Sequence, residues 1–433
     1  MHKENWTENR TKKRAKFSLR PILPGPGFLG PLKDLAQDLT TKSAWLEGMV
    51  ALQTARAIGD RLRLINSYYS NLIEGHKTTI SQVVRALKKD FSGDESARYA
   101  QELCRAHVLS ERELMDGLGV AGLEVTSPAY IQKIHALFYA HLPEAHQFAS
   151  HSDGFTDIPV APGQFRDRSV SFDGLHAHGP EATDVGAAMD WLHASYRSDN
   201  FHGDEKVIAA AAAHHRLTFI HPFRDGNGRV SRLFTGLCLA RSGLNTGNLW
   251  SLSRGLSKRK SEYMSSLRYA DSPEIGFVEG QGVLIEEQLA DFCQFILETC
   301  VDQVEFMRTI LGLQEINARI DWYVEKRASQ TDRPLPKLAP RLLRALFAEG
   351  EIPRARAKEI LGVHEKTASR VVSALHAEGL VESRSSRAPL VVGLPEHILQ
   401  YYFPSLFEPA LLGEEYTRMV LPPKKNPASA ARN

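Results

Sequence analysis

The sequence predicts a mainly α-helical protein with one short β-hairpin and a small mixed module near its C-terminus. Helix formers with apolar residues at helical spacing run over about 43–74, 80–116, 128–148 and 181–327. Residues 155–178 interrupt this pattern with Pro and Gly around an alternating run, which predicts the hairpin. Pro334, Pro336 and Pro340 then stop the helices, so we expect a domain boundary there.

Composition excludes several classes of protein. The chain has 433 residues, 42% of them hydrophobic, which is enough for two to four ordinary cores and excludes a small scaffold or a largely disordered chain. A net charge of +2 excludes a protein that coats polyanions over its whole surface. No apolar stretch approaches the ~20 residues that cross a bilayer, and the four cysteines are scattered. We therefore expect a cytoplasmic protein without membrane contact.

The N-terminal third predicts an arm followed by helices. Residues 2–20 are rich in Lys and Arg and lack the apolar run of a secretory signal. The next segment, 21–27, alternates Pro and Gly and predicts an extended connector. We accordingly expect an arm and connector over 1–42 and a helical region over 43–125.

The C-terminal module predicts three short helices and a β-ribbon. Helices are expected over 340–349, 354–361 and 364–378, with Gly362 in the tight turn before the third, and strands over 380–383 and 390–392. This order is that of a winged helix-turn-helix over 338–399, followed by a tail over 400–433.

The stretch His221–Arg232 holds more residues suited to binding and catalysis than any other segment of this length. An Ala-rich helix over about 205–218 precedes it, and a second helix is expected from about Gly228, with a core face that would consist of Val230, Leu233, Phe234 and Leu237. Gly226, Asn227 and Gly228 therefore lie at a helix N-terminus. Gly and Asn accept left-handed backbone conformations, and the helix dipole favours anions there, so the loop predicts an anion-binding nest.

Charged side chains around this loop indicate which anion it binds. Arg229 and Arg232 are spaced i, i+3 and can reach the same phosphates. Asp225 would repel phosphate unless Mg²⁺ lay between them. An imidazole such as that of His221 can take a proton from an incoming hydroxyl near neutral pH. Each feature alone is more often a turn, a cap or a solvated cation, but together they predict a site for ATP and Mg²⁺.

The same stretch matches every defining position of His-x-Phe-x-Asp/Glu-Gly-Asn-Gly-Arg-x-x-Arg, and in this the chain resembles Fic proteins. The resemblance implies a Fic fold over 126–329, with helices around the motif and a β-hairpin flap. It implies transfer of AMP from ATP to a Ser, Thr or Tyr hydroxyl of a target protein, with auto-adenylylation left open. Phe223 would anchor the loop in the core.

The resemblance also assigns roles to the charged residues. His221 would be the general base and Asp225 the Mg²⁺ ligand. Arg229 would contact the β-phosphate region and Arg232 the γ-phosphate. The α- and β-phosphates would be bound by Gly226, Asn227 and Gly228.

A second resemblance lies upstream, in the six residues from Ser70 to Gly75. On a helix Ser70 and Glu74 share a face, and Gly75 favours a helix end. The stretch resembles the Fic inhibitory motif Ser/Thr-x-x-x-Glu-Gly/Asn, which implies that Glu74 pairs with Arg232 and withholds it from the γ-phosphate. We therefore expect an autoinhibited enzyme.

Two further expectations follow from the resemblance. A target protein would dock on the flap by strand addition, against a set of residues that comprises Gly163, Phe165, Val170 and Phe172. Tyr263, on the helix near 258–267, would stack on or border the adenine.

Other functions stay open at this stage. The chain could be a DNA-binding regulator whose core senses nucleotide, or the module over 338–399 could bind protein instead of DNA. Glu74 could also orient a water for removal of AMP. The target protein, the state of oligomerisation and the signal that releases Glu74 are not encoded in any pattern that we recognise.

Overall fold

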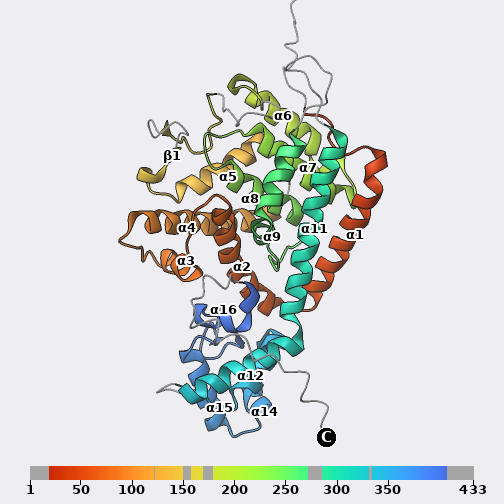
Figure 1. Cartoon of the computed structure of the whole chain (residues 1–433). Helices are drawn as coiled ribbons and strands as arrows, with labels where there is room; N and C mark the ends of the chain where they lie inside the picture. Colours follow the sequence, from red (N-terminus) through yellow and green to blue (C-terminus); the bar gives the residue numbers. More distant parts are fainter. Residues whose placement is uncertain are drawn as a thin grey trace, which may run out of the picture. The chain divides into compact units, whose positions relative to one another are not determined.

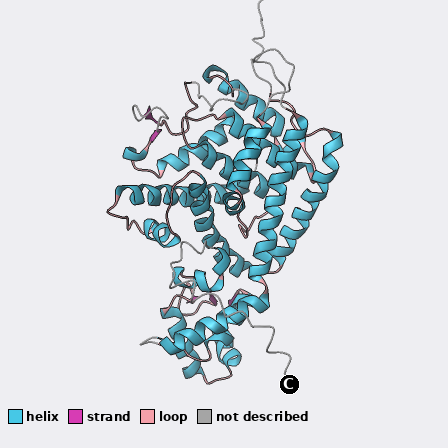
Figure 2. Ribbon diagram, in the orientation of Figure 1, coloured by secondary structure: helices cyan, strands magenta, loops and turns pink. Residues whose placement is uncertain are grey.

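The computed structural model describes residues 19–120, 122–149, 158–168, 179–271, 285–330 and 334–406. Helices dominate these ranges and strands are few and short (Figure 2), which confirms the predicted mainly α class. Most of the expected basic arm, the end of the tail, and Val170 and Phe172 of the expected flap lie outside the described residues.

The chain divides into two compact units, which we describe separately. Unit 1 comprises Met1–Gln37, Glu113–Ser242 and Arg259–Glu298. Unit 2 comprises Asp38–Arg112, Gly243–Lys258 and Thr299–Asn433.

Unit 1 is built around α7 (Glu205–Ile220) and α8 (Asn227–Arg241), which pack against each other (Figure 1). The Ala-rich stretch of α7 is buried, and such small side chains let helices approach closely. α5 (Pro128–Ala140) covers α8, and α6 (Val185–Tyr196) covers α7. The core face expected for α8 is buried as predicted, since it is formed by Val230, Leu233, Phe234 and Leu237.

The first helix begins earlier than expected. α1 (Pro26–Gly48) starts inside the segment that we predicted to be an extended connector, so that prediction is wrong from residue 26 onward, and the expected arm and connector over 1–42 contains most of this helix. Pro26 occupies the first helical position, where its missing N–H costs no hydrogen bond. Leu32, Ala36 and Leu39 are buried at helical spacing and supply the packing that stabilises the helix.

Two short strands pair in this part of unit 1. β1 (Phe148–Ala149) pairs antiparallel with β2 (Ile158–Pro159), whereas the described residues from 160 to 168 form no strand. Apart from Arg168, the alternating run 168–172 on which the predicted hairpin rests lies outside the described residues, so a hairpin there stays a prediction.

Unit 2 centres on α2 (Leu52–Ile73). α2 packs on α9 (Leu252–Lys258), and a further cluster joins it to α3 (Ile80–Leu87) and α4 (Glu95–Asp116). The helix is held along this side by polar contacts as well, because the hydroxyl of Ser67 donates to the carbonyl of Cys104 at 2.7 Å.

The C-terminal module, residues 339–392, belongs to unit 2. It contains α13 (Ala339–Glu349), β3 (Glu351–Ile352), α14 (Ala357–Leu361), α15 (Glu365–Ala377), β4 (Val381–Glu382) and β5 (Leu390–Val392). The three strands form an antiparallel sheet in the order β3-β5-β4, with Val381 opposite Val392. Gly362, at a φ of +68°, makes the turn between α14 and α15. We keep the winged helix-turn-helix interpretation for this order of elements. α16 (Glu396–Tyr402) follows the module.

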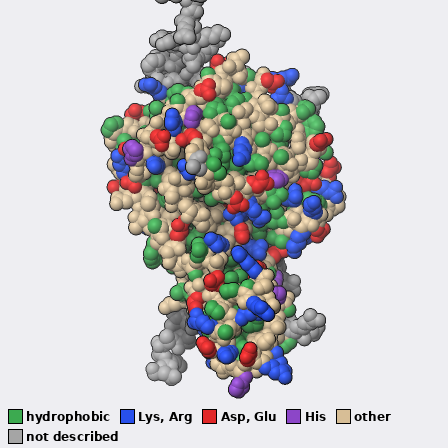
Figure 3. Space-filling view, turned by 180° about the vertical axis from the view of Figure 1, so that it is seen from behind, with side chains coloured by type: hydrophobic (Ala, Val, Ile, Leu, Met, Phe, Trp, Pro, Cys, Tyr) green, Lys and Arg blue, Asp and Glu red, His purple; other side chains and the backbone are tan. Residues whose placement is uncertain are grey.

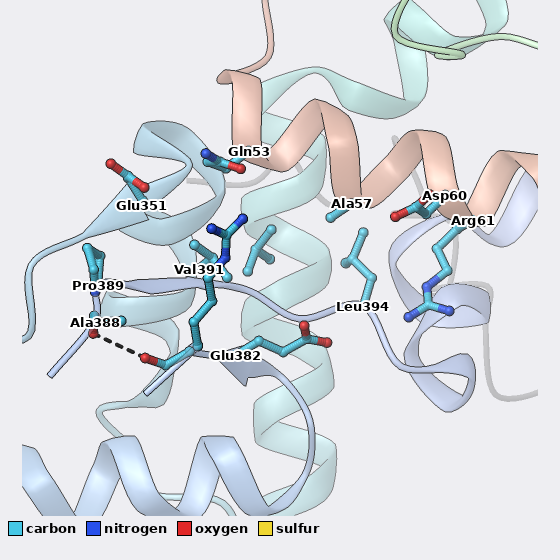
Figure 4. Close-up of a pocket in the computed structure, with 13 residues that line it drawn as sticks. Gln53, Ala57, Asp60, Arg61, Glu351, Glu382, Ala388, Pro389, Val391 and Leu394 are labelled. Atoms are coloured by element: carbon cyan, nitrogen blue, oxygen red, sulfur yellow. Dashed lines mark hydrogen bonds between the residues drawn. The ribbon is translucent and has the colours of Figure 1, made fainter. Parts of the chain in front are cut away.

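α2 is attached directly to this module. The hydroxyl of Thr54 donates to the carbonyl of Phe347 at 3.1 Å, at the end of α13. Gly350 has a φ of +82°, and a Cβ there would lie 2.9 Å from that of Ala51. Between α2 and the sheet lies a cavity of about 590 Å³ (Figure 4). At the other end of α2 the hydroxyl of Tyr69 donates to the carbonyl of Leu406 at 2.9 Å.

Among the residues that the structure describes, none of the helices is both long and apolar enough to cross a membrane.

A glycine in α2 tests this packing. An added Cβ at Gly59 would collide with the carbonyl oxygen of Gly247. We expect Gly59→Ala to lower the free energy of unfolding by about 1–3 kcal/mol, since backbone rather than a flexible side chain must move. Gly48→Ala, also in unit 2 and with no atom near the new methyl group, is the control and should change it by less than about 0.5 kcal/mol. Urea unfolding of both variants measures the difference, and equal losses would contradict the close approach.

Candidate active site

The loop between α7 and α8 is bracketed by two residues in left-handed conformation. α7 ends at His221, with a φ of 50°, and α8 is preceded by Gly226, with a φ of 79°. A Cβ at Gly226 would lie 3.2 Å from the ring of Tyr139, so both conformation and space favour glycine. Asn227 and Gly228, which could also have been left-handed, instead begin the helix. Their N–H groups belong to the first turn, which has no intrahelical acceptors.

Asn227 closes this loop with its side chain. Its Oδ1 accepts a hydrogen bond from the N–H of Phe223 at 2.9 Å, and its Nδ2 donates to the carbonyl of the same residue at 2.8 Å. The amide is 4% exposed and both of its ends are engaged. Asn227 can therefore serve a bound anion through its backbone, whereas its side chain shapes the loop.

Phe223 is fully buried, as expected of an anchor. Its ring stacks on His135, with centroids 4.0 Å apart, and lies 5.7 Å from Phe165. Burial lowers the pKa of His135 to about 4, so its ring is neutral and its Nδ1 accepts the N–H of Gly163 at 2.8 Å. Gly163 and Phe165, which we predicted to dock a target, thus pack against the loop through His135 and Phe223.

Asp225 is the carboxylate of the loop. Burial opposes its ionisation, but the charge of Arg229, the hydroxyl of Tyr139 and the N–H of Gly226 outweigh burial and lower the pKa of Asp225. Arg229 reaches it at 2.9 Å, and Tyr139 donates to the same oxygen. The carboxylate is 37% exposed, so it is ionised and open to solvent on one side.

The side chains near Asp225 determine which metal ion could bind there. Among the described residues, no three His, Cys, Asp or Glu side chains gather to hold an ion by themselves. A single ionised carboxylate fits Mg²⁺ where phosphate and water oxygens supply the remaining ligands. The site therefore fits Mg²⁺ that arrives with a nucleotide.

Arg166 is a residue of this site that the sequence interpretation did not single out. It is 3% exposed, and its Nε donates to the carbonyl of His221 at 2.8 Å. Other donors reach the carbonyls of Ile220, Arg168 and Pro180, and its N–H donates to the carbonyl of Pro222 at 2.8 Å. One buried guanidinium thus satisfies the C-terminal carbonyls of α7 and the segments on both sides of residues 169–178. A lone Arg after Gly163-Gln164-Phe165 carries no sequence signal of this role.

Tyr263 is placed differently from our expectation. Its ring is 2% exposed, and its hydroxyl lies 2.8 Å from Nε2 of His214. Nδ1 of His214 lies 2.6 Å from the hydroxyl of Thr235. This chain of polar contacts joins α10 (Lys260–Ala270) to α7 and α8 inside the core. This burial argues against stacking on a base, whereas a position that borders the adenine stays a prediction.

The end of α2 has the form that its sequence predicts. The N–H of Gly75 bonds to the carbonyl of Leu72, and that of His76 to the carbonyl of Asn71, both at 3.0 Å. With Gly75 at a φ of +95°, these bonds form a Schellman motif. Ser70 is buried and Glu74 is the exposed C-cap residue. A carboxylate here faces the negative end of the helix dipole, so it does not stabilise α2.

The role of Arg166 can be tested on stability. Arg166→Met keeps the length of the side chain but removes every donor, and we expect the free energy of unfolding to fall by about 2–3 kcal/mol because several buried carbonyls lose their charged partner. Arg224→Met is the control, since Arg224 also joins this loop to its surroundings but through surface contacts with Asp167 and Pro159. Its loss should stay below about 1 kcal/mol. A smaller loss for Arg166→Met than for the control would rule out this role.

Comparison with known proteins agrees with the motif. Residues 125–239 match the model of the Fic/DOC family. Protein adenylyltransferase Fic of Drosophila willistoni is 30% identical over 180 residues, which are 41% of this chain and 32% of that protein. The same protein of Drosophila mojavensis is 29% identical over 180 residues, covering 41% of this chain and 31% of its own length. The chain thus spans about a third of the curated relatives that it matches.

Solved structures give a weaker likeness. A Fic family protein from Desulfovibrio desulfuricans G20 covers 87% of this chain and 99% of its own, with a TM-score of 0.48 and 19% identity. Fic-1 from C. elegans covers 67% of this chain and 75% of its own, with a TM-score of 0.48 and 16% identity.

The family match contains the whole stretch from His221 to Arg232, and the chain therefore carries a domain of the Fic/DOC family.

Proposed function

We propose that this chain is an autoinhibited protein adenylyltransferase, which transfers AMP from ATP to a hydroxyl side chain of a target protein. The observation that carries the proposal is the loop from His221 to the first turn of α8, where a helix N-terminus, an ionised carboxylate and buried arginines meet. The curated relatives are named for the same activity. A cytoplasmic location agrees with the scattered free cysteines.

The chemistry assigned to His221 is general base catalysis. The hydroxyl of the target attacks the α-phosphorus of ATP, the bond from that phosphorus to the bridging oxygen of the β-phosphate breaks, and pyrophosphate leaves with the electron pair. His221 accepts the proton of the attacking hydroxyl. Its left-handed backbone turns the chain away from the axis of α7, and Arg166 holds its carbonyl. The imidazole is thereby carried on a backbone of fixed position.

Phosphate binding is assigned to the start of α8. The N–H groups at Gly226, Asn227 and Gly228 and the dipole of α8 favour an anion. Arg229 and Arg232 are both 4% exposed, so their charges are screened little by water and act strongly on a phosphate that reaches them. Asp225 would hold Mg²⁺, whose charge offsets that of the triphosphate.

Autoinhibition is assigned to Glu74. Its position as the C-cap of α2 gives that helix no electrostatic benefit, which favours a role outside the helix. We propose that Glu74 pairs with Arg232 and denies it to the γ-phosphate, and that an activating signal separates them. Removal of AMP by water that Glu74 orients is the second reaction open to the same residues.

His221 gives the first test of the function. We expect His221→Ala to lower the rate of AMP transfer by about 10²–10⁴ while ATP binding changes less than about threefold, because the phosphate ligands stay in place. His141→Ala is the control, since His141 lies in the same unit but contacts Glu113 instead of the loop. Incubation with α-labelled ATP and a cell extract measures transfer, and calorimetry measures binding. Undiminished transfer would remove His221 from the mechanism.

Glu74 gives the second test. We expect Glu74→Gly to raise auto-adenylylation by about one to two orders of magnitude, the equivalent of one charge-assisted hydrogen bond. Arg232→Ala should not activate, because it removes a phosphate ligand. The double variant should be as slow as Arg232→Ala alone, since Glu74 then has no partner. An unchanged rate for Glu74→Gly at saturating ATP and Mg²⁺ would refute autoinhibition and leave the role of His221 intact.

A further inference from the structure

α15 of the C-terminal module has one buried and one exposed face. Ala368, Val371, Val372 and Leu375 are buried against the module. The opposite face is short, polar and basic, and it consists of Lys366, Ser369, Arg370, Ser373 and His376. No large apolar side chain stands on this face, so it does not resemble the core of a protein interface, whereas short polar and basic side chains suit base edges and phosphates.

The loop between β4 and β5, residues 383–389, is held by its own serines. The hydroxyl of Ser383 donates to the carbonyls of Ser385 and Ala388, at 2.8 and 3.1 Å, and Figure 4 shows the second of these bonds. The hydroxyl of Ser385 accepts the N–H groups of Arg387 and Ala388. Arg384 and Arg387 are therefore exposed on a turn that is already formed.

The cations of this module fall into two groups. Arg344 lies 3.2 Å from Asp321, and Arg356 lies 2.7 Å from Glu349, so both are neutralised within unit 2. Within the described ranges, no ion pair is found for the second group, which comprises Arg354, Lys358, Lys366, Arg370, Arg384 and Arg387. This second group comes from the turn before α14, α14 itself, the exposed face of α15 and the loop after β4. Its charge is available to an external polyanion.

We propose that this surface, which we call the α15 face, binds double-stranded DNA, with α15 in the major groove. In helix-turn-helix proteins the second helix enters that groove while neighbouring segments contact the backbone. The cations before and after α15 in the chain are suited to phosphates, and Arg370 on the helix is suited to guanine. Glu365 in the first turn repels phosphate but can accept a hydrogen bond from cytosine.

Two observations restrict binding to this face. The side of the sheet toward α2 borders the cavity shown in Figure 4, which is lined by Asp60, Glu351 and Glu382 together with Arg61 and Arg384, so charges of both signs meet there. Arg384 is thus the one cation of the proposed surface that also borders this cavity. On the face of the molecule shown in Figure 3, acidic and basic side chains alternate without a broad area of one sign. Glu359 on α14 further reduces the local positive charge, so we expect modest affinity with a clear dependence on salt.

The test uses the full chain and a fluorescein-labelled duplex of mixed sequence, about 30 base pairs long, over salt from about 50 to 200 mM. Fluorescence anisotropy should show binding that weakens steeply with salt. Lys366→Ala/Arg370→Ala and Arg384→Ala/Arg387→Ala should each weaken binding at least about tenfold and reduce the slope of log K against log salt by about 1 for each phosphate that is no longer neutralised. The control, Arg344→Ala/Arg356→Ala, makes the same change in net charge but removes cations that already have carboxylate partners, and it should stay within about twofold of the native chain.

The inference goes beyond the proposed enzymatic function and does not depend on it, since no step of the assay uses ATP. Thermal melting of each variant establishes that it is folded. Equal losses of DNA affinity in the control and the α15-face variants would show that binding depends on net charge alone, and this would overturn the proposal. Absence of duplex binding at the lowest salt would also overturn it and favour a protein partner. Equal affinity for the matching single strand would overturn the placement of α15 in a groove.

Discussion

The site depends on how the loop before α8 satisfies its own backbone. A tight connection between two buried helices contains N–H and C=O groups that water reaches poorly, and each must find a partner. Asn227 serves both polar groups of Phe223, and Arg166 serves the carbonyls at the end of α7. Because side chains satisfy these groups, the first turn of α8 is not needed to close the loop. An anion can then accept hydrogen bonds from the N–H groups of this turn without displacing any hydrogen bond that holds the loop.

The loop also determines which groups compensate the negative charge of Asp225. In this structure the carboxylate shares one oxygen between Tyr139 and Arg229. A triphosphate brings negative charge that Arg229 would also attract, so the arginine must divide its charge between the two. A Mg²⁺ ion held by Asp225 would supply that carboxylate with another positive partner, and Arg229 would then be available to the phosphates. The nucleotide and the metal are therefore expected to bind together.

Much of the fold and the motif could be predicted from the sequence, because they rest on local patterns. The core face of α8, the buried Phe223 and the helix end at Gly75 follow from periodicity, from the motif and from glycine chemistry. What was missed depends on contacts distant in sequence. Nothing near Arg166 indicates that it meets carbonyls more than fifty residues away, and an aromatic on α10 has the same sequence pattern whether it faces a base or His214. Pro26 misled us because proline disrupts the interior of a helix yet suits its first position.

The attachment of α2 to the C-terminal module affects how deletion experiments should be interpreted. Thr54 donates to the end of α13 near the start of α2, and Tyr69 donates to Leu406 one residue before Ser70. A chain shortened before residue 339 would lose both acceptors and uncover the part of α2 that contacts α13 and β5. Any change in rate or affinity in such a chain would reflect a loosened α2 as much as the loss of the module itself. Point substitutions on the α15 face leave the contacts of Thr54 and Tyr69 in place and therefore separate the two causes.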